Sequence, residues 1–363
     1  MTTYLLAGGG TAGHVNPLLA VADALRARNP DDTILVVGTK EGLESRLVPE
    51  RGYELLTIPK LPFPRRPNVD AMKFGSRLRA AVAQVASIIT TNSVDVVIGF
   101  GGYASAPAYL AARRTRVPLV IHEANAKPGL ANRLGARYTP YVGVAFHHTR
   151  IRHARFVGMP LRLEIEQLDR DALRPLAVEE FGLDASRPTV LVTGGSLGAR
   201  RLNTTINETA TDLVATGYQI LHITGARGEA VDPGIPHYHV LDYCSRMELA
   251  LAITDLAVSR AGSATVSELC AVGVPAVYIP YPVGNGEQRY NAADVVRAGG
   301  AVMVDDARFV PDWVRSTLVP LLGDRMRVHD MAAQSKSVGV TDGTARLIRL
   351  VDEAIGSRVS AAR

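Results

Sequence analysis

Two glycine-rich turns in this chain could hold an anion through main-chain amides. The first, Gly8-Gly-Gly-Thr-Ala-Gly-His14, follows an apolar run at residues 4–7, and the second spans residues 193–198. A glycine turn that opens a helix directs N–H groups and the positive end of the helix dipole at one point, which favours a phosphate or diphosphate. A tight structural turn explains either loop alone equally well. Two such turns at equivalent places favour a ligand held between two domains.

Two side chains add chemistry to these turns. His14 could take or give a proton near neutral pH, although a single histidine is more often structural. Ser196 could add a hydroxyl donor to the second turn. Neither turn is followed by Gly-Lys-Ser/Thr, and neither has the G-x-G-x-x-G spacing with an acidic residue about 20 positions later. The sequence therefore disfavours both a P-loop and a dinucleotide site.

The segment at residues 259–268 could bind a phosphorylated sugar through the start of a helix. A Gly-Ser turn leads into that helix, and the amides of Ala264 and Thr265 could bind phosphate. Glu268 lies about one turn further on, where it could accept two hydrogen bonds from a ribose diol. Taken alone, Glu268 is more often a solvated helix residue.

Two more polar segments follow predicted strands. Gln288 and Asn291 share one helical face at i, i+3, where their amides could recognise sugar hydroxyls or cap the helix. His122-Glu-Ala-Asn125 ends a buried strand at residues 117–121, and its alternative role is hydrogen bonding within the loop. No Asp-x-Asp pair stands at a strand end, so we expect neither a metal nor a cofactor.

The elements that must position these residues are short apolar strands alternating with helices. Strands are expected at residues 4–7, 33–37, 94–98 and 117–121, and again at residues 189–193, 219–224, 256–259 and 276–279. Such continuous apolar runs predict parallel sheets covered on both faces, with ligands beyond the carboxyl ends of the strands. The chain is therefore predicted to be an α/β protein with two Rossmann-like halves. Residues 326–358 are predicted to be helical.

Composition supports an ordinary globular protein. The chain has 363 residues, 47% of them hydrophobic and 21% charged, and a prior of about 150 residues per domain suggests two domains. Two cysteines cannot form a disulfide framework or a four-ligand zinc site, which suits a reduced cytosol. The start lacks a basic leader, and the apolar stretch at residues 96–112 is too short to span a bilayer. We expect a soluble protein, or one that lies on a membrane.

Charge is unevenly distributed along the chain. Residues 1–160 carry a net charge of +10, whereas residues 161–363 carry −5, so the first half is expected to meet an anionic surface. Basic and apolar residues are interleaved within residues 61–79, which suits an anionic membrane. A helix with a solvated basic face and a buried apolar stripe explains this pattern about equally well. Nucleic-acid binding is a weaker alternative, because aromatic residues make up only 6% of the chain and no recognition motif occurs. The predicted membrane residues are Arg65, Arg66, Met72, Lys73, Phe74, Arg77 and Leu78.

Six motifs of the chain together resemble those of the MurG family of peptidoglycan N-acetylglucosaminyltransferases. They occur in the family's order and spacing over nearly the whole chain: Gly9-Gly-Thr-Ala-Gly-His14, Gly101-Gly-Tyr103, His122-Glu-Ala-Asn125, Gly194-Gly-Ser196, Ser263-Ala-Thr-Val-Ser-Glu268 and Gln288-Arg-Tyr-Asn-Ala292. The resemblance implies the GT-B fold, in which two Rossmann-like doubly wound parallel-sheet domains face a cleft. It also implies an acceptor- and membrane-facing domain at residues 1–158, joined by a C-terminal helix at about residues 342–363. A UDP-sugar-binding domain would then occupy residues 159–341.

The resemblance also implies a reaction and a location. The enzyme would transfer N-acetylglucosamine (GlcNAc) from UDP-GlcNAc to the C4 hydroxyl of the N-acetylmuramic acid (MurNAc) of lipid I, undecaprenyl-pyrophosphoryl-MurNAc-pentapeptide. The transfer would invert the anomeric carbon and form lipid II for the peptidoglycan of the cell wall, and so serve cell shape, division and the cell cycle. The enzyme would lie peripherally on the cytoplasmic face of the cell membrane. The alternatives are a UDP-GlcNAc 2-epimerase, another GT-B glycosyltransferase, or a non-catalytic nucleotide-binding subunit.

Site roles are implied residue by residue. His14 would be the base or charge stabiliser, with Glu123 in reserve. Glu268 would bind the ribose, and the turn at residues 263–265 would bind the phosphates. The backbone near Cys244 would bind the uracil. The implied substrate-binding residues are Thr11, Ala12, Gly13, Asn125, Arg162, Ser196, Cys244, Ser263, Ala264, Thr265, Val266, Ser267, Glu268 and Gln288. Ala12 departs from the family pattern, where glycine is usual, and restricts how closely the first turn can approach a phosphate.

Overall fold

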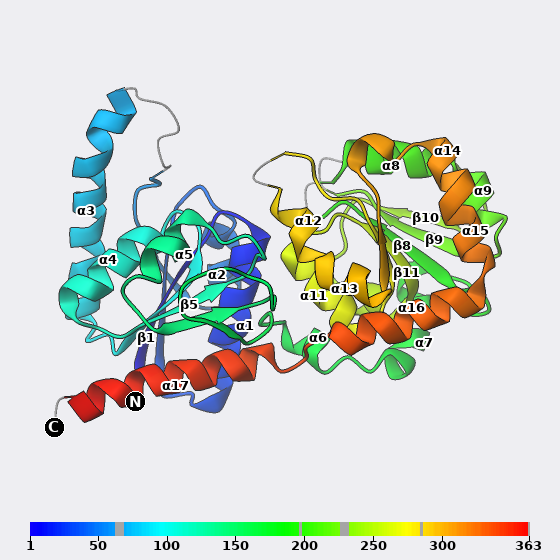
Figure 1. Cartoon of the computed structure of the whole chain (residues 1–363). Coiled ribbons are helices and arrows are strands. Elements are labelled where there is room, and N and C mark those ends of the chain that lie inside the picture. The colour runs from blue at the N-terminus through cyan, green and yellow to red at the C-terminus, as the bar shows by residue number, and fades with distance from the viewer. Residues whose placement is uncertain (62–68, 196–197, 226–231, 284–285, 362–363) are drawn as a thin grey trace. The chain divides into compact units, whose positions relative to one another are not determined.

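The described chain forms two compact units (Figure 1). The computed structural model describes residues 1–61, 69–195, 198–225, 232–283 and 286–361, except for the side chains of residues 69–72 and 358–361. Unit 1 consists of residues 1–162 and 342–363, and unit 2 of residues 163–341. The sequence placed the first boundary at 158/159, whereas the structural division falls at 162/163.

Unit 1 is built on a seven-stranded sheet in the order β3-β2-β1-β4-β5-β6-β7, with every neighbouring pair parallel. Its central strands are short runs of valine, isoleucine and leucine, which suits a sheet buried on both faces. The strands are β1 (Thr3–Gly8), β2 (Thr33–Gly38), β3 (Glu54–Thr57), β4 (Val96–Gly101), β5 (Leu119–Glu123), β6 (Tyr141–Val144) and β7 (Ala154–Phe156).

Helices cover both faces of this sheet. On one face, α1 and α17 pack with Tyr4 and Leu6 of β1, and on the other, α3 and α4 pack with Leu5 and Ala7. Successive side chains of a strand point to opposite faces, so β1 is at the centre of both hydrophobic clusters. The helices of unit 1 are α1 (Ala12–Arg28), α2 (Glu44–Glu50), α3 (Val69–Thr91), α4 (Ser105–Thr115), α5 (Leu130–Gly135) and α17 (Gly343–Ala361).

Residues 326–358 are almost entirely helical, as predicted, but two helices in different units occupy the region. The first, α16 (Arg325–Val338), belongs to unit 2, whereas α17 packs on α1 within unit 1 (Figure 1). The start of α17 lies against the main chain of unit 1, where a Cβ at Gly343 would lie 2.3 Å from the Met159 carbonyl oxygen. Helical periodicity does not reveal such a break, since both segments have helix-forming composition.

Unit 2 repeats the topology of unit 1. Its six-stranded sheet has the order β10-β9-β8-β11-β12-β13, again with parallel neighbours. The first five strands of each unit thus share the 3-2-1-4-5 order of Rossmann-like sheets, which confirms the predicted fold class. The strands are β8 (Thr189–Thr193), β9 (Gln219–Ile223), β10 (Tyr238–Leu241), β11 (Thr254–Ser259), β12 (Ala276–Tyr278) and β13 (Ala301–Met303).

Short helices surround the second sheet. Before β8 lie α6 (Leu163–Glu166) and α7 (Arg170–Phe181), and between the strands lie α8 (Arg200–Glu208), α9 (Ala210–Val214), α10 (Met247–Ile253), α11 (Ser263–Val272), α12 (Glu287–Asn291) and α13 (Ala293–Ala298). After β13 come η1 (Asp306–Arg308), α14 (Pro311–Trp313), η2 (Val314–Leu318), α15 (Val319–Gly323) and α16.

The strand order reverses beside β1 in unit 1 and beside β8 in unit 2. In open α/β sheets, ligands bind outside the carboxyl ends of the strands at such switch points. The two glycine turns of the sequence follow β1 and β8 directly. Each therefore lies where its own sheet would bind a ligand.

The packing of α4 on β4 provides a test of the fold. A Cβ on Gly99 would lie 2.0 Å from Cε1 of the buried Tyr109. We expect Gly99→Ala to lower the free energy of unfolding by about 1–3 kcal/mol, because the core is overpacked there. Gly75→Ala is the matched control: its Cβ would meet nothing within 4 Å in α3, so stability should rise by up to about 1 kcal/mol. Urea unfolding followed by circular dichroism measures both, and a Gly99→Ala protein as stable as wild type would contradict the packing.

Candidate active site

The turn after β1 in unit 1 is held by contacts with two neighbouring strand ends. Gly10 has a φ of +91°, which glycine adopts readily. A Cβ on Gly102, at the end of β4, would lie 2.3 Å from the Gly9 carbonyl oxygen. On the other side, the Gly10 N–H donates to Oε2 of Glu44 at 2.7 Å. No sequence motif points to Glu44, because nothing in the run of residues 40–44 distinguishes it from the nearby Glu41.

His14 lies in the first turn of α1. Its Nδ1 is 3.2 Å from Oγ1 of the exposed Thr11, and a Cβ on Gly101 would lie 3.1 Å from its Nε2. Burial lowers the pKa of His14, whereas a hydrogen bond to the Gly9 backbone and the negative charge of Glu44 raise it. Because burial dominates, the imidazole is mainly neutral at pH 7. A neutral imidazole can accept a proton.

The other residues predicted for the first turn are at the start of the same helix. Thr11 precedes α1 with an extended backbone, and Ala12 and Gly13 are half-buried in its first turn. The first amides of a helix have no intrahelical acceptor. These residues therefore provide main-chain donors beside His14.

Glu123, at the end of β5, is 2% exposed and fully engaged in hydrogen bonds. Its Oε1 accepts the N–H of Asn125, and its Oε2 accepts the N–H of Gly129 and Nδ2 of Asn132, each at 2.9 Å. Burial raises the pKa of Glu123, and these donors oppose that rise. The carboxylate therefore holds the loop that carries the half-buried Asn125.

In unit 2, the turn after β8 is closed by glycines. Gly195 and Gly198 have φ of +87° and +81°, and the Gly198 N–H donates to the Gly195 carbonyl at 2.9 Å. A Cβ on Gly225, after β9, would lie 2.2 Å from the Gly198 nitrogen. The predicted hydroxyl donor, Ser196, lies outside the described residues.

The start of α11 offers a second group of amides in unit 2. Its N-cap, Gly262, is extended and provides no side-chain cap, so the first amides of the helix are open to a ligand. Within this helix, Ser263 and Val266 are buried, whereas Ala264, Thr265, Ser267 and Glu268 are half-buried. The arrangement suits an anion at the helix start, with a carboxylate further along the helix.

Arg260 supports this turn and was missed by the motif analysis. It is 9% exposed and its Nη1 lies 2.6 Å from Oδ1 of Asp306 and 3.0 Å from the Ile279 carbonyl oxygen. Asp306 also pairs with Nε of Arg201 at 3.1 Å. The adjacent Ser-Arg-Ala-Gly sequence gave no signal that the arginine is buried.

The remaining predicted site residues are dispersed. Gln288 Oε1 accepts the Tyr281 N–H at 2.9 Å, and the buried Asn291 donates from Nδ2 to the Ala261 carbonyl at 3.2 Å. These bonds tie α12 to the ends of β12 and β11. Cys244 is buried after β10, and Arg162 is half-buried at the end of the first segment of unit 1.

The predicted membrane residues lie on and before α3. Lys73 and Arg77 are exposed, and Phe74 and Leu78 are half-buried. Arg65, Arg66 and the side chain of Met72 lie outside the described residues. Among the helices in the described part of the chain, the longest apolar stretches fall short of what crossing a bilayer requires.

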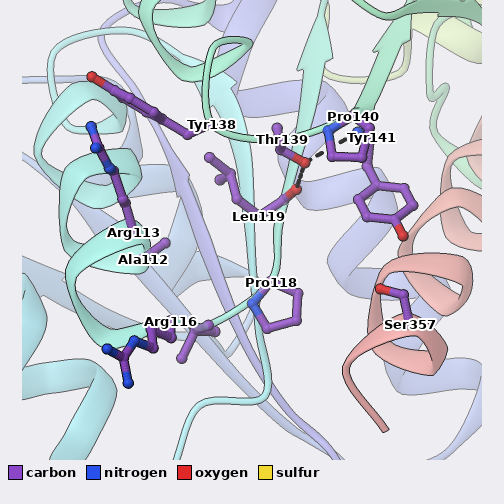
Figure 2. A pocket seen from close by; sticks show the side chains of 11 residues that line it. Ala112, Arg113, Arg116, Pro118, Leu119, Tyr138, Thr139, Pro140, Tyr141 and Ser357 are labelled. Carbon is purple, nitrogen blue, oxygen red and sulfur yellow. Dashed lines mark hydrogen bonds between the residues drawn. The ribbon is translucent and has the colours of Figure 1, made fainter. Parts of the chain in front are cut away.

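A hollow of about 490 Å³ lies at the opposite, amino-terminal edge of the unit 1 sheet. Figure 2 shows the side chains of Arg113, Arg116 and Tyr138 on one side of it and Tyr141 and Ser357 on the other. The guanidinium of Arg113 lies 4.4 Å from the centre of the Tyr138 ring, a cation–π contact. The hollow is lined by α4 and the starts of β5 and β6, so it lies at the edge of the unit 1 sheet opposite the glycine turn after β1.

Both units match one glycosyltransferase family. Residues 4–144 match the glycosyltransferase family 28 N-terminal domain, and residues 189–347 match the glycosyltransferase family 28 C-terminal domain. The two matches cover β1 to β6 of unit 1, the whole sheet of unit 2, and the glycine turns that follow β1 and β8.

Full-length relatives narrow the family. A protein of Leifsonia xyli subsp. xyli named "UDP-N-acetylglucosamine--N-acetylmuramyl-(pentapeptide) pyrophosphoryl-undecaprenol N-acetylglucosamine transferase" is 65% identical, covering 97% of this chain and 98% of its own. A protein of Clavibacter sepedonicus with the same name is 62% identical, covering 99% and 98%. The crystal structure of Acinetobacter baumannii MurG superposes with a TM-score of 0.77 at 26% identity, covering 97% of this chain and 100% of its own. With such identity across nearly its full length, the chain belongs to the MurG family of N-acetylglucosamine transferases, within glycosyltransferase family 28.

Proposed function

We propose that this chain transfers GlcNAc from UDP-GlcNAc to the C4 hydroxyl of the MurNAc in lipid I, forming lipid II with inversion at the anomeric carbon. The observation that carries the proposal is the 65% identity, over 97% of the chain, to a relative named for that transfer. The product is a precursor of peptidoglycan, so the proposed roles in cell-wall biogenesis, cell shape and cell division follow from the reaction.

Unit 2 provides the groups proposed to bind the donor. The uncapped start of α11 directs the amides of Ser263, Ala264 and Thr265 at one point, which suits the diphosphate. Glu268, between the buried Val266 and Leu269, would accept hydrogen bonds from the ribose. Gln288 would contact the sugar, and the backbone near Cys244 would contact the uracil. Ser196, together with Arg162 at the end of the first segment of unit 1, would contact the diphosphate or the nucleotide.

Unit 1 provides the proposed base. The C4 oxygen of MurNAc attacks C1 of GlcNAc while the bond from C1 to the β-phosphate oxygen breaks, and UDP leaves with the bonding electron pair. The hydroxyl proton passes to the imidazole of His14, which is mainly neutral at pH 7 because burial lowers its pKa. Glu123 has all its oxygens engaged by main-chain and amide donors, so we assign it to holding Asn125, which would reach the sugar.

Negative charge develops on the leaving diphosphate. The amides at the start of α11 and the Arg162 guanidinium would stabilise this negative charge through fixed dipoles and a positive charge. The amides near Thr11 to Gly13 in unit 1 would also contact the phosphates. We propose that this stabilisation suffices without a metal, so transfer should persist in EDTA.

Membrane attachment would bring unit 1 to its lipid acceptor. Lys73 and Arg77 are exposed one turn apart near the start of α3. Basic residues placed in this way bind anionic headgroups. We propose a peripheral position on the cytoplasmic face of the membrane.

The reaction is tested by incubating the protein with radiolabelled UDP-GlcNAc and a short-chain lipid I analogue. The expected result is release of UDP together with a labelled β-linked disaccharide product, since the α-linked donor is inverted. Consumption of UDP-GlcNAc without acceptor would instead indicate a 2-epimerase, and transfer only to other acceptors another GT-B glycosyltransferase. Binding of UDP without turnover would indicate a non-catalytic subunit.

Replacing the proposed base should reduce turnover and reveal its pKa. His14→Ala should lower kcat by about 10²- to 10⁴-fold, the usual contribution of a general base. In wild type, the acid limb of kcat/KM should have its midpoint below 6.5, the ordinary histidine pKa, because burial lowers the pKa of His14 and the base stays neutral as the pH falls. His329→Ala, on the exposed face of α16, is the control. A His14→Ala enzyme with near-normal turnover would remove His14 from the chemistry.

Replacing the proposed ribose acceptor should weaken donor binding. Glu268→Gln should raise the Kd for UDP by about tenfold or more, because hydrogen bonds to charged groups contribute about 1.5–3 kcal/mol. Isothermal titration calorimetry measures this directly. Glu179→Gln, on the exposed side of α7, should bind UDP like wild type. Equal affinity for the Glu268 variant would argue against contact with the ribose.

Reversing charge on α3 should weaken membrane binding. The double variant Lys73→Glu and Arg77→Glu should bind vesicles containing phosphatidylglycerol at least about tenfold less, since each basic residue near the surface contributes about 1 kcal/mol. Wild-type binding should fall as salt is raised and be weak on phosphatidylcholine vesicles. The double variant Arg308→Glu and Arg327→Glu, on the exposed surface of unit 2, is the control. Equal sedimentation of both variants would contradict the proposed surface.

A further inference from the structure

Glu44 is a buried acid at the start of α2, with 1% of its surface exposed. Its carboxylate turns back toward the ends of two neighbouring strands. Oε2 accepts the Gly10 N–H at 2.7 Å, and Oε1 accepts both the N–H and the hydroxyl of Thr39 at 2.9 Å. A buried carboxylate needs hydrogen bonds in place of lost water, and these three donors supply them. Glu44 therefore joins the turn after β1 to the end of β2.

The surrounding glycines leave room for this side chain. A Cβ on Gly9, Gly38 or Gly42 would lie 1.9–2.5 Å from an atom of Glu44. Larger residues at these positions would displace the carboxylate. The glycines of the first turn thus make room for the buried Glu44 carboxylate, in addition to any role in binding a ligand.

A short path of contacts leads from Glu44 to His14. Gly10, held by the carboxylate, is followed by Thr11, whose carbonyl oxygen accepts the His14 N–H at 3.0 Å. The Thr11 hydroxyl lies 3.2 Å from Nδ1 of His14. Moving the Gly10 peptide would therefore shift the residue that contacts both the main chain and the ring of His14.

Glu44 is also the charged group that acts on the imidazole. The titratable groups that interact with His14 in the described chain are Glu44 on α2 and His122 on β5. Burial lowers the pKa of His122 to about 4, so it is neutral near pH 7. Near the His14 ring, β4 contributes the Gly101 backbone and α5 contributes the Asn132 amide. On α17, Asp352 pairs with Arg28, which lies at the end of α1 farthest from His14. The negative charge of Glu44 favours the protonated imidazole.

We propose that Glu44 is a positioning residue for proton transfer: its carboxylate fixes the Gly9–Thr11 turn, and through it the imidazole of His14 that receives the acceptor hydroxyl proton. The inference rests on the proposed function, in which His14 is the base. Glu44 acts through the turn and through its charge, and does not itself touch substrate.

Three variants of the full chain test the proposal. Glu44→Gln removes the charge and replaces one of the two accepting oxygens with an amide N–H, so either the Gly10 N–H or the Thr39 N–H loses its acceptor. Glu44→Asp keeps the charge but shortens the side chain. Glu50→Gln, an exposed residue of the same helix that pairs with Arg46, is the matched control. Folding is checked by circular dichroism and thermal unfolding, and the His14 pKa is measured by NMR with ¹³C-labelled histidine, its signal assigned with His14→Gln.

The expected results separate position from charge. Glu44→Gln should lower kcat by about 10- to 100-fold, change the KM for UDP-GlcNAc much less, and move both the acid limb and the NMR pKa of His14 to lower pH. Glu44→Asp should also lose kcat by about tenfold or more, with a smaller change in the His14 pKa. Glu50→Gln should match wild type.

Two results would overturn the proposal. One is a folded Glu44→Gln enzyme with the kcat and His14 pKa of wild type, and the other is a Glu44→Asp enzyme with wild-type kcat. A wild-type protein without transferase activity would refute the proposed function instead. In that case the NMR titration of wild type and Glu44→Gln still decides whether Glu44 controls the His14 pKa.

Discussion

Contacts between main-chain segments that only glycine permits fix the carboxyl end of each sheet. In unit 1, a Cβ on Gly102 would lie 2.3 Å from the Gly9 carbonyl oxygen, and in unit 2, a Cβ on Gly225 would lie 2.2 Å from the Gly198 nitrogen. Each contact joins the turns of neighbouring strands, and each of these turn glycines except Gly9 has a positive φ. Side chains would force the turns apart and move the helices that follow them. The positions of His14 and of α8 therefore depend on these glycines.

The two units stabilise similar turns with opposite charges. In unit 1, the buried carboxylates of Glu44 and Glu123 accept main-chain N–H groups from the turns that surround them. In unit 2, the buried Arg260 supports the turn before α11, with its charge balanced by Asp306. The fixed negative charge of Glu44 beside the first turn favours a protonated imidazole, and the uncapped amides at the start of α11 have, among the described residues, no buried carboxylate bound to their turn and favour a diphosphate. This difference agrees with assigning proton transfer to unit 1 and donor phosphates to unit 2.

The sequence predicted the repeated architecture well because the signal is local. Each central strand is a continuous apolar run that ends in glycine or polar residues, so both sheets could be inferred from residues 4–7, 189–193 and their equivalents. Its periodicity alone could not show that the region at residues 326–358 divides between two units, because periodicity does not record which core a helix packs on, and the division was expected only from the family resemblance. It also missed Glu44 and Arg260. Their burial depends on donors and partners far away in the sequence, such as Gly10 for Glu44 and Asp306 for Arg260.

Burial shifts the pKa values of the two candidate bases, His14 and Glu123, in opposite directions. It lowers the pKa of His14, which leaves a neutral imidazole with a lone pair, and it raises the pKa of Glu123. The Glu123 oxygens, however, are already committed to three donors that hold the loop at residues 125–132, so accepting a proton there would break bonds that position the loop. His14 has no such loop to release, and its Nδ1 faces the hydroxyl of an exposed residue, Thr11. Protonating His14 would preserve its hydrogen bond to the Gly9 backbone, because that bond favours the charged ring, so the geometry favours the histidine over the carboxylate.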